Sequence, residues 1–540
     1  MHPKLAALIS GYGSRFLGLE KLLNHKLSPD EEIRLNAPLP GLGRYYKSVS
    51  FLENVTSAKC VGLLRFWVMK KYFFALADRM NKYEGKYAHQ KIVSSVSDLS
   101  PEDFKFIQGL GTTALEVRQA ELLERVSEHD TAAAGDLLKI FTAYFRPGLA
   151  KVMDGIHFAG TSEDVMGNVF GIIARMLAHG HFMGGLADFC LAFINFAKYC
   201  EQEGELILPG LTHIQVAEPT FLSRRFSVPL RGIQQILLDM LTPHMDFKPF
   251  SGKLGGALGN LTTHFAAYPD TNWEIFARNF VEGLGLYYEP LTHQSVSFVR
   301  ESQQFKSIAG ILDQICKLVS DFINMVSCPG QLMVKVKQEG TKGSSVLPGK
   351  VNLWAMEGAL RAFRWAKKDL LFLAEELTDF PFEGDMGRSY LMRNIGLPFM
   401  HIFIGFDRVL SELAKCHPNF RKINLFLDEY PGMAGSSLQT ILKRAGIEGD
   451  AYRKIQTISI NPDDSYANQQ EFRTNLEVMM QELDLPPELR NELLSCLDFA
   501  SLIKPSARIT SREVEKMETF FQIIKDKSEQ HKRHEALLAL

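Results

Sequence analysis

The chain has 540 residues, a length that favours three or four domains. With 46% hydrophobic and 23% charged residues, its composition is ordinary for a globular protein. Lys and Arg number 60 and Asp and Glu 62, so the net charge of −2 lacks the basic excess typical of proteins that bind nucleic acid or acidic membranes. This balance is still compatible with a small basic pocket for an anionic substrate. No run of about 18 apolar residues is free of polar breaks, so we expect no transmembrane helix, and no signal-peptide cleavage site is evident.

The seven cysteines are scattered along the chain and form no CxxC pair. This spacing predicts neither a disulfide framework nor a zinc ribbon, and it is typical of a reduced, cytoplasmic protein. His179 and His181 stand two residues apart, and this pair alone does not indicate a metal site.

The first unusual polar segment, HFAGTSEDV at 157–165, places Thr161 and Ser162 just before two acidic residues. This pattern is typical of a helix N-cap with acids in the first turn. Free N–H groups at a helix start also favour an anion, so a carboxylate-binding site is the alternative.

Two further segments follow. LTHIQVAEPT at 211–220 carries His213, and a lone histidine is usually structural or on the surface. KLGGALGNLTTHFAAYP at 253–269 is rich in glycine. Its glycines would allow either a close approach of the backbone to a ligand or close packing of helices.

The later part of the chain alternates between helical patterns and loops. LMVKVK at 332–337 alternates apolar and polar residues and predicts a short hairpin arm, and 339–350 predicts a mobile loop. Apolar residues three and four apart predict a helix over 356–377. Pro486 and Pro487 predict a helix start, and the charged C-terminal run from 523 predicts a solvated helix.

The fourth polar segment, GSSVLPGKVNL at 343–353, follows the start of that loop. Two serines beside a lysine could place an activated hydroxyl over a substrate, whereas a plain flexible loop is the simpler alternative.

Together and in this order, the four segments resemble the aspartase/fumarase superfamily, and most closely its adenylosuccinate lyase family. The segment at 343–353 resembles the family loop GSSxMPxKxNP, and the segment at 212–220 resembles THGQPATPT. The motif TSED is intact at 161–164, and GxxGNxxxHxAAYP is intact at 256–269. Further matches are Gly43-Arg44-Tyr45, His129-Asp130, Gln294 and the stretch from Ser389 to Arg393. The resemblance runs from about residue 38 to about residue 500.

The resemblance implies an all-α, three-domain fold whose central domain is a bundle of long helices. The implied domains are residues 1–158, 159–408 and 409–540. Members of the family form homotetramers, and each active site takes motifs from three subunits. The resemblance also implies that no metal or organic cofactor is needed.

The implied reaction is elimination of fumarate from adenylosuccinate, and from the succinyl-carboxamide ribotide, in purine nucleotide biosynthesis. By resemblance, Ser344 is the base that removes a proton beside a carboxylate, and His213 is the acid that protonates the leaving nitrogen. Lys350 and Asn352 would stabilise the carboxylate charge, and Glu357 would polarise a histidine.

The remaining implied roles are those of substrate binding. Thr161, Ser162, Thr212 and Gln294 would position the succinyl part, and Asp130 would also bind the substrate. His129 would support the site as one of the catalytic residues. Arg44, Tyr45, Ser389 and Arg393 would hold the nucleotide phosphate.

The chain departs from the family pattern at several positions. Ile214 replaces the glycine beside the catalytic histidine, and Leu347 and Leu353 replace Met and Pro. Gly384 stands where the family has a phosphate-contacting arginine, and Arg388, four positions on, could reach the same phosphate. A fumarate-releasing lyase with another succinylated substrate, and a non-catalytic homologue, are therefore the alternatives.

Overall fold

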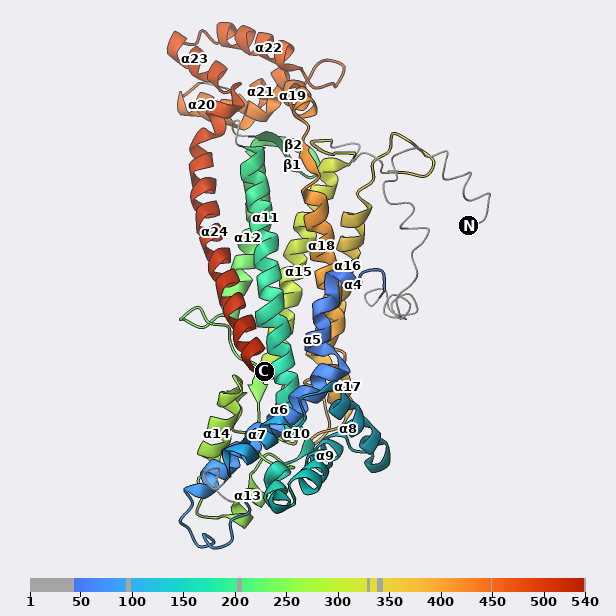
Figure 1. Cartoon of the computed structure of the whole chain (residues 1–540). Coiled ribbons are helices and arrows are strands. Elements are labelled where there is room, and N and C mark those ends of the chain that lie inside the picture. The colour runs from blue at the N-terminus through green and yellow to red at the C-terminus, as the bar shows by residue number, and fades with distance from the viewer. Residues whose placement is uncertain are drawn as a thin grey trace, which may run out of the picture.

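The computed structural model describes residues 43–93, 99–201, 206–327, 331–337, 343–447 and 449–538. Helices dominate these ranges, and the strands within them form three two-stranded sheets (Figure 1). The predicted all-α fold class with a central bundle of long helices is confirmed.

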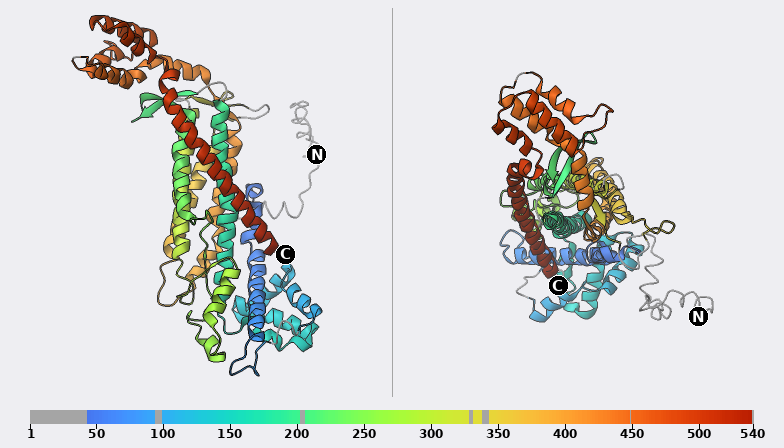
Figure 2. Two further views of the ribbon diagram at one scale, coloured as in Figure 1. Left: turned by 90° about the vertical axis from the view of Figure 1, so that its left-hand side faces the viewer. Right: turned by 90° about the horizontal axis from the view of Figure 1, so that it is seen from above.

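Long helices run side by side through the centre of the molecule (Figures 1 and 2). In α15 (Val299–Val326), Phe305, Ile308, Leu312 and Ile315 are fully buried at steps of three and four, so the helix presents one apolar stripe to its neighbours. The helix predicted over 356–377 is confirmed as α16 (Trp354–Glu376), which packs between α15 and α18. The other bundle helices are α10 (Ser162–Arg175), α11 (Met183–Cys200), α12 (Leu222–Met240) and α18 (Gly396–Leu413).

The longest element of the bundle is formed by α10, the π-helical segment η6 (Met176–Phe182) and α11, which continue into one another. This run, Ser162–Cys200, has 39 residues and therefore spans about 55 Å. By length and composition alone it could cross a membrane, but 72% of its most apolar window is buried inside the protein. The burial is that of a core helix in a bundle.

The lower end of the bundle, at the bottom of Figure 1, is surrounded by further helices from three parts of the chain. These are α6 (Ala58–Asn81), α7 (Pro101–Gly109), α8 (Ala114–Ser127), α9 (Asp130–Phe145), α13 (Thr262–Ala267), α14 (Trp273–Gly283) and α17 (Gly387–Arg393). The N-terminal elements α4 (Tyr46–Val49), η2 (Ser50–Leu52) and α5 (Glu53–Thr56) lead into α6, and η4 (Pro147–Leu149) and η5 (Val152–His157) lead into α10.

The upper end carries a small helical lobe with its own apolar core, in which Leu438, Phe472 and Leu493 are fully buried. It consists of α19 (Phe420–Glu429), η7 (Pro431–Ala434), α20 (Gly435–Arg444), α21 (Ala451–Ser459), α22 (Gln469–Glu482) and α23 (Pro487–Ser495). The predicted helix start at Pro486 and Pro487 is confirmed, because Pro486 is the N-cap of α23. The division into domains at 158/159 and 408/409 stays a prediction.

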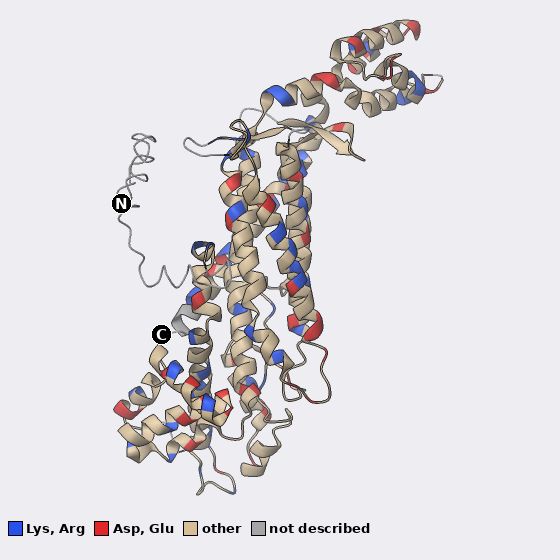
Figure 3. Ribbon diagram, turned by 90° about the vertical axis from the view of Figure 1, so that its right-hand side faces the viewer, with Lys and Arg blue, Asp and Glu red and all other residues tan. Residues whose placement is uncertain are grey.

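The last helix, α24 (Phe499–Leu538), returns from the upper lobe along α11 and α12 (Figure 2). The sequence predicted a solvated helix from residue 523. The helix is confirmed, but one of its faces is buried and not solvated. Phe521, Ile524 and Ser528 are fully buried, because this face packs on the bundle. Acidic and basic residues are interspersed along the bundle and on both ends, in keeping with the balanced composition (Figure 3).

The three small sheets join segments that are mostly distant in sequence. β1 (Ile207–Thr212) and β2 (Gln215–Phe221) form an antiparallel hairpin, and β3 (Ser251–Gly252) pairs in parallel with β4 (Tyr287–Tyr288). The strand predicted at 332–337 exists as β5 (Met333–Lys335), but it is not a hairpin arm. It pairs with β6 (Cys416–Pro418), because α16 and α18 run down and back up the bundle between them. Residues 339–342 of the predicted loop lie outside the described residues.

Candidate active site

Apart from Arg44 and Tyr45, the residues predicted for the site fall into two groups at opposite ends of the bundle. The upper-end group lies on the β1–β2 hairpin, on the segment 343–352 and in the first turn of α16, and consists of Thr212, His213, Ser344, Lys350, Asn352 and Glu357. The lower-end group lies on the helix starts and loops at the other end, and consists of His129, Asp130, Thr161, Ser162, Gln294, Ser389 and Arg393. Figure 1 shows the separation along the bundle axis.

The length of the bundle keeps the two groups apart within one chain. Thr161 immediately precedes α10, and the hairpin follows the end of α11, so about 55 Å of helix lies between them. No small ligand could contact both Thr161 and His213 of the same chain. A site that uses both groups therefore needs a second copy of the chain.

The turn of the upper hairpin is strained. Thr212 pairs with Gln215, and the two residues between them, His213 and Ile214, have φ values of 53° and 64°. Two-residue hairpins favour this geometry, but usually with Asn and Gly, because a Cβ is disfavoured at positive φ. Ile214 is branched at Cβ and 90% exposed, so nothing it buries offsets the strain. His213 is exposed at the tip of the hairpin.

The segment 343–352 folds back on itself and is anchored to the bundle. Ser344 Oγ accepts hydrogen bonds from the backbone N–H groups of Val346 (3.3 Å) and Leu347 (3.1 Å). Asn352 donates from Nδ2 to the carbonyl of Gly343 at 3.0 Å, which joins the two ends of the segment. Ser344 and Asn352 are half-buried and Lys350 is exposed.

The anchor of this segment is Lys335 on β5. Its Nζ donates to the carbonyl of Asn352 at 2.9 Å and forms a 2.6 Å ion pair with Glu412 of α18, whose side chain is 2% exposed. A buried charge pair of this kind holds its neighbours in one geometry, since a shift would leave a charge unpaired. Lys335 therefore links the start of α16 to α18.

Arg44 and Tyr45 do not join Ser389 and Arg393 in one chain. Arg408 of α18 donates to Tyr45 Oη at 2.7 Å and stacks over the Tyr45 ring. Arg408 lies near the upper end of α18 and Arg393 just before its start, about 20 Å away along the helix. Arg44 is exposed beside Tyr45. Glu357 is exposed on α16.

The lower-end group is organised around the buried carboxylate of Asp164. This carboxylate accepts from the backbone N–H groups of Thr161, Gly255 and Gly256, each at 2.9 Å, and pairs with Lys253 at 3.0 Å. The side chains of Lys253 and Asp164 are 1% and 3% exposed. Thr161 is the N-cap of α10, as the N-cap pattern predicted. Glycine is required in this turn, because a Cβ on Gly255 would lie 2.6 Å from Cα of Gly259 and Gly256 has a φ of 74°.

Lys253 extends this network to two more segments. Its Nζ also donates to the carbonyls of Gly256 (3.0 Å) and Gln294 (2.8 Å). The backbone N–H of Gln294 in turn donates to the carbonyl of Glu383 at 3.0 Å. The TSED motif, the glycine-rich segment, Gln294 and the segment 381–389 thus meet at the lower end.

Asp130 forms a second charged centre in the same group. Its carboxylate pairs with Arg65 at 2.9 Å and with Arg393 at 2.8 Å, and accepts from the Thr131 backbone N–H. Burial alone would raise the pKa of the Asp130 carboxyl, but the two guanidinium groups hold that pKa below its ordinary value. Asp130 is therefore ionised at neutral pH.

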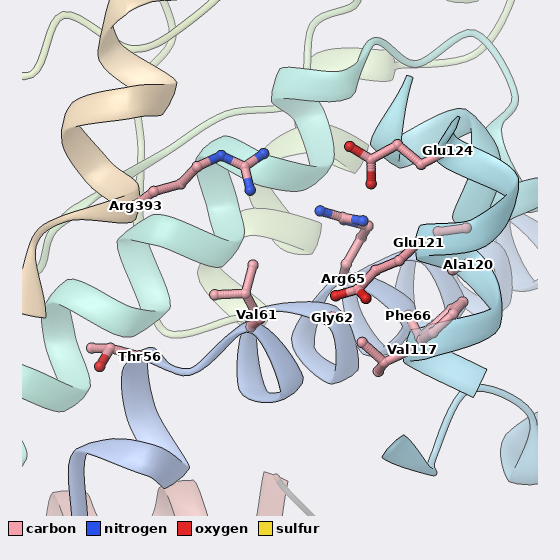
Figure 4. Close-up of a pocket in the computed structure, with 12 residues that line it drawn as sticks. Thr56, Val61, Gly62, Arg65, Phe66, Val117, Ala120, Glu121, Glu124 and Arg393 are labelled. Carbon is pink, nitrogen blue, oxygen red and sulfur yellow. The ribbon is translucent and has the colours of Figure 1, made fainter. Parts of the chain in front are cut away.

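A cavity of about 210 Å³ lies next to this centre. Arg393 of α17 and Arg65 of α6 approach it from opposite sides, and Glu121 and Glu124 of α8 lie beyond Arg65 (Figure 4). The sequence did not indicate Arg65, because a single arginine in an apolar helix carries no pattern. His129 is exposed and caps α9 through Nδ1, and Ser162 and Ser389 are half-buried on α10 and α17.

Thr212 borders a larger groove of about 1270 Å³ between the hairpin, α12, α15 and the upper lobe. Arg224, Arg225 and Lys317 also line it, but His213 and Ser344 do not. In the part of the chain that the structure describes, no group of three His, Cys, Asp or Glu side chains could hold a metal ion.

Comparison of the sequence with known protein families shows which class of protein this chain belongs to. A family model described as lyase matches residues 88–361, about half of the chain. The chain belongs to this lyase family and is a lyase enzyme. Its fold resembles that of β-carboxy-cis,cis-muconate cycloisomerase from Acinetobacter calcoaceticus, with a TM-score of 0.58 at 13% identity over 87% of this chain and 98% of that one.

Individual proteins with similar sequences include several adenylosuccinate lyases. The chain is 26% identical to the adenylosuccinate lyase of Legionella pneumophila (strain Corby) over 470 residues, which cover 85% of this chain and 95% of that protein. It is 24% identical to that of Dictyostelium discoideum over 492 residues, 86% of this chain and 97% of the relative. The predicted resemblance to adenylosuccinate lyase is confirmed.

We predict that Ile214→Gly raises the free energy of unfolding by about 1 kcal/mol, because it removes a Cβ from a left-handed position at little loss of buried surface. Urea-induced unfolding of the full chain measures the change. Val216→Gly is the matched control, since Val216 lies in β2 of the same hairpin and its loss should destabilise. If Ile214→Gly destabilises as much as Val216→Gly does, the turn is not strained.

We also predict that Lys253→Met lowers the free energy of unfolding by about 3–5 kcal/mol, because it leaves the Asp164 carboxylate buried without its cation. The control is Lys82→Met, which removes the exposed i,i+4 pair with Asp78 and should cost little. Equal unfolding midpoints for the two variants in urea would contradict a supporting role for the Lys253–Asp164 pair.

Proposed function

We propose that this protein is a C–N lyase that eliminates fumarate from adenylosuccinate and from the succinyl-carboxamide ribotide of purine nucleotide biosynthesis. The observation that carries the proposal is the division of the matched motifs between the two ends of one rigid bundle. The base and acid motifs lie at one end and the substrate-binding motifs at the other, as a site shared between subunits requires. The names of the relatives support the choice of substrate.

The chemistry begins at Ser344. Two backbone N–H groups already donate to its Oγ, and hydrogen bonds to an oxygen favour the form that carries negative charge. The Ser344 oxyanion takes the proton from the carbon beside a carboxylate of the succinyl group. Lys350 and Asn352 stabilise the charge that moves onto that carboxylate.

The C–N bond breaks in the next step. The electron pair of the deprotonated carbon forms the double bond of fumarate, and His213 gives its proton to the departing nitrogen. The exposed tip of the hairpin lets His213 reach a ligand that another subunit binds. Glu357 polarises a histidine in the assembled site, and His129 supports the site from the lower end.

The lower-end group binds the substrate in this proposal. Thr161, Ser162 and Gln294 position the succinyl carboxylates together with Thr212 of another subunit. Ser389 and Arg393 hold the phosphate, and Arg44 and Tyr45 complete that site from a different chain. Because Asp130 orients Arg393 and Arg65, it acts on the phosphate end through these arginines.

Assembly into a homotetramer is part of the same proposal, and the division of the motifs between the two ends supports association of at least two copies. A two-fold axis across the bundle brings the lower end of one copy beside the upper end of the next. Large apolar side chains on the bundle helices support this association, since Val228 of α12 is 68% exposed and Trp365 and Phe372 of α16 are 63% and 54% exposed. The six described cysteines are free thiols, which fits a cytoplasmic location.

A second candidate is the same elimination on a different succinylated amine. Gly384 favours it, because the family arginine that contacts phosphate is missing at this position. Fumarate release from another succinylated amine, with none from adenylosuccinate, would select this alternative.

We predict that Ser344→Ala and His213→Ala each lower the rate of fumarate release from adenylosuccinate by about 10²–10⁴-fold at an unchanged unfolding temperature. Ser411→Ala and His89→Ala serve as controls, because both residues are exposed outside the motifs. Turnover near the wild-type rate in either motif variant would end the assignment of that residue.

We predict that mixing inactive Ser344→Ala and His213→Ala subunits restores part of the activity, because some of the proposed shared sites would draw both intact residues from different chains. Subunit exchange is followed by mass spectrometry of tagged copies, and activity by fumarate release. Mixed tetramers that remain inactive would argue against base and acid coming from different subunits.

A further inference from the structure

Arg388 carries a buried positive charge whose hydrogen-bonding capacity is largely unused. Its side chain lies on α17 and the residue is 4% exposed. Nη2 donates to the carbonyl of Asp385 at 3.3 Å, whereas Nε and Nη1 have no hydrogen-bond partner among the described residues. Cζ of the guanidinium lies over the ring of Phe380, 3.9 Å from its centroid. Buried donors without acceptors are costly, and a bound anion is one way to satisfy them.

The backbone at Gly384 makes room for this guanidinium. Gly384 has a φ of 147°, a conformation that favours glycine. A Cβ at this position would lie 2.5 Å from Nη2 of Arg388 and 3.2 Å from Oε1 of Gln294. A side chain at 384 would therefore displace the guanidinium of Arg388, and the positive φ would strain it as well.

The charge of Arg388 is also less compensated than that of its neighbours. Arg65 and Arg393 share the carboxylate of Asp130, but no carboxylate lies within ion-pair distance of Arg388 in the described ranges. Asp385 and Glu163 act on it only from a greater distance. Among these three arginines, Arg388 is thus the one best able to take an external anion.

A neutral polar side chain, that of Gln294, lies close to Arg388. The Gln294 side chain lies beside the same glycine, and its backbone is held by Glu383 and Lys253. An arginine fork beside an amide is a common arrangement for binding oxyanions.

We propose that Arg388, with Gln294 beside it and Gly384 making room for its guanidinium, binds an oxyanion of the substrate, either a phosphate or a carboxylate. The site rests on the proposed function only for the identity of the molecule that carries this oxyanion. Its anion-binding capacity follows from the buried, unpartnered guanidinium.

The test is equilibrium binding of inorganic phosphate and of fumarate to the full-length protein, measured by calorimetry and by the rise in unfolding temperature. Arg388→Gln should weaken binding of at least one anion by about tenfold or more. Arg388→Lys should fall between, because it keeps the charge without the fork, and Gly384→Ala should weaken binding because its Cβ displaces the guanidinium.

The control is Arg278→Gln, which removes an arginine that stacks on Tyr288 at the same end of the bundle but is exposed. It should bind both anions as the wild type does, and it corrects for the general stabilising effect of phosphate salts. Without anions, Arg388→Gln should unfold at or above the wild-type temperature, since it removes buried donors without partners.

The two binding experiments distinguish whether Arg388 contacts a phosphate or a carboxylate of the substrate. Arg388-dependent binding of phosphate supports a phosphate-bearing substrate, and Arg388-dependent binding of fumarate supports a carboxylate contact. Binding of neither anion, or binding equally strong in Arg388→Gln, overturns the proposal even if the protein releases fumarate from adenylosuccinate. Conversely, Arg388-dependent binding with no fumarate release from adenylosuccinate retains the anion site and rejects the proposed substrate.

Discussion

The buried ion pair between Asp164 and Lys253 is the constraint on which the lower end of the molecule depends. Asp164 uses both carboxylate oxygens to hold the start of α10 and two glycine N–H groups, and Lys253 holds Gln294. Gln294 holds the segment 381–389 through Glu383, so that Arg388 and Gly384 are positioned by the same network. A buried pair tolerates little displacement, because either partner alone would be an uncompensated charge.

The long helices impose the second constraint. A run of 39 residues is rigid enough to keep the TSED motif and the hairpin apart, whatever their chemistry. The two ends are also built differently: the lower end is tightly hydrogen-bonded, whereas His213 is exposed on a strained turn and Lys350 is exposed on its segment. A preformed binding surface at one end and accessible reactive groups at the other suit a site completed by association.

Local features of the fold were predictable. The stripe over 356–377, the N-cap at Thr161 and the helix start at Pro487 all depend on residues within one or two turns. The hairpin at Ile207–Phe221 was missed, because Pro209, Gly210 and Pro219 break the alternation expected of strands. The prediction that β5 is a hairpin arm was wrong for a related reason. Its partner β6 lies some 80 residues further on, and no local pattern connects the two strands.

The sequence by itself determined the helical class, the family resemblance and the residue types that could carry the chemistry, because periodicity, caps and motifs are local. Only the tertiary structure decided which of these residues meet. It added Arg65 to the Asp130 centre, separated Arg44 and Tyr45 from Arg393, and placed the guanidinium of Arg388 in the space left by Gly384. Such contacts depend on the directions of side chains from segments far apart in the chain, and packing of the bundle sets those directions.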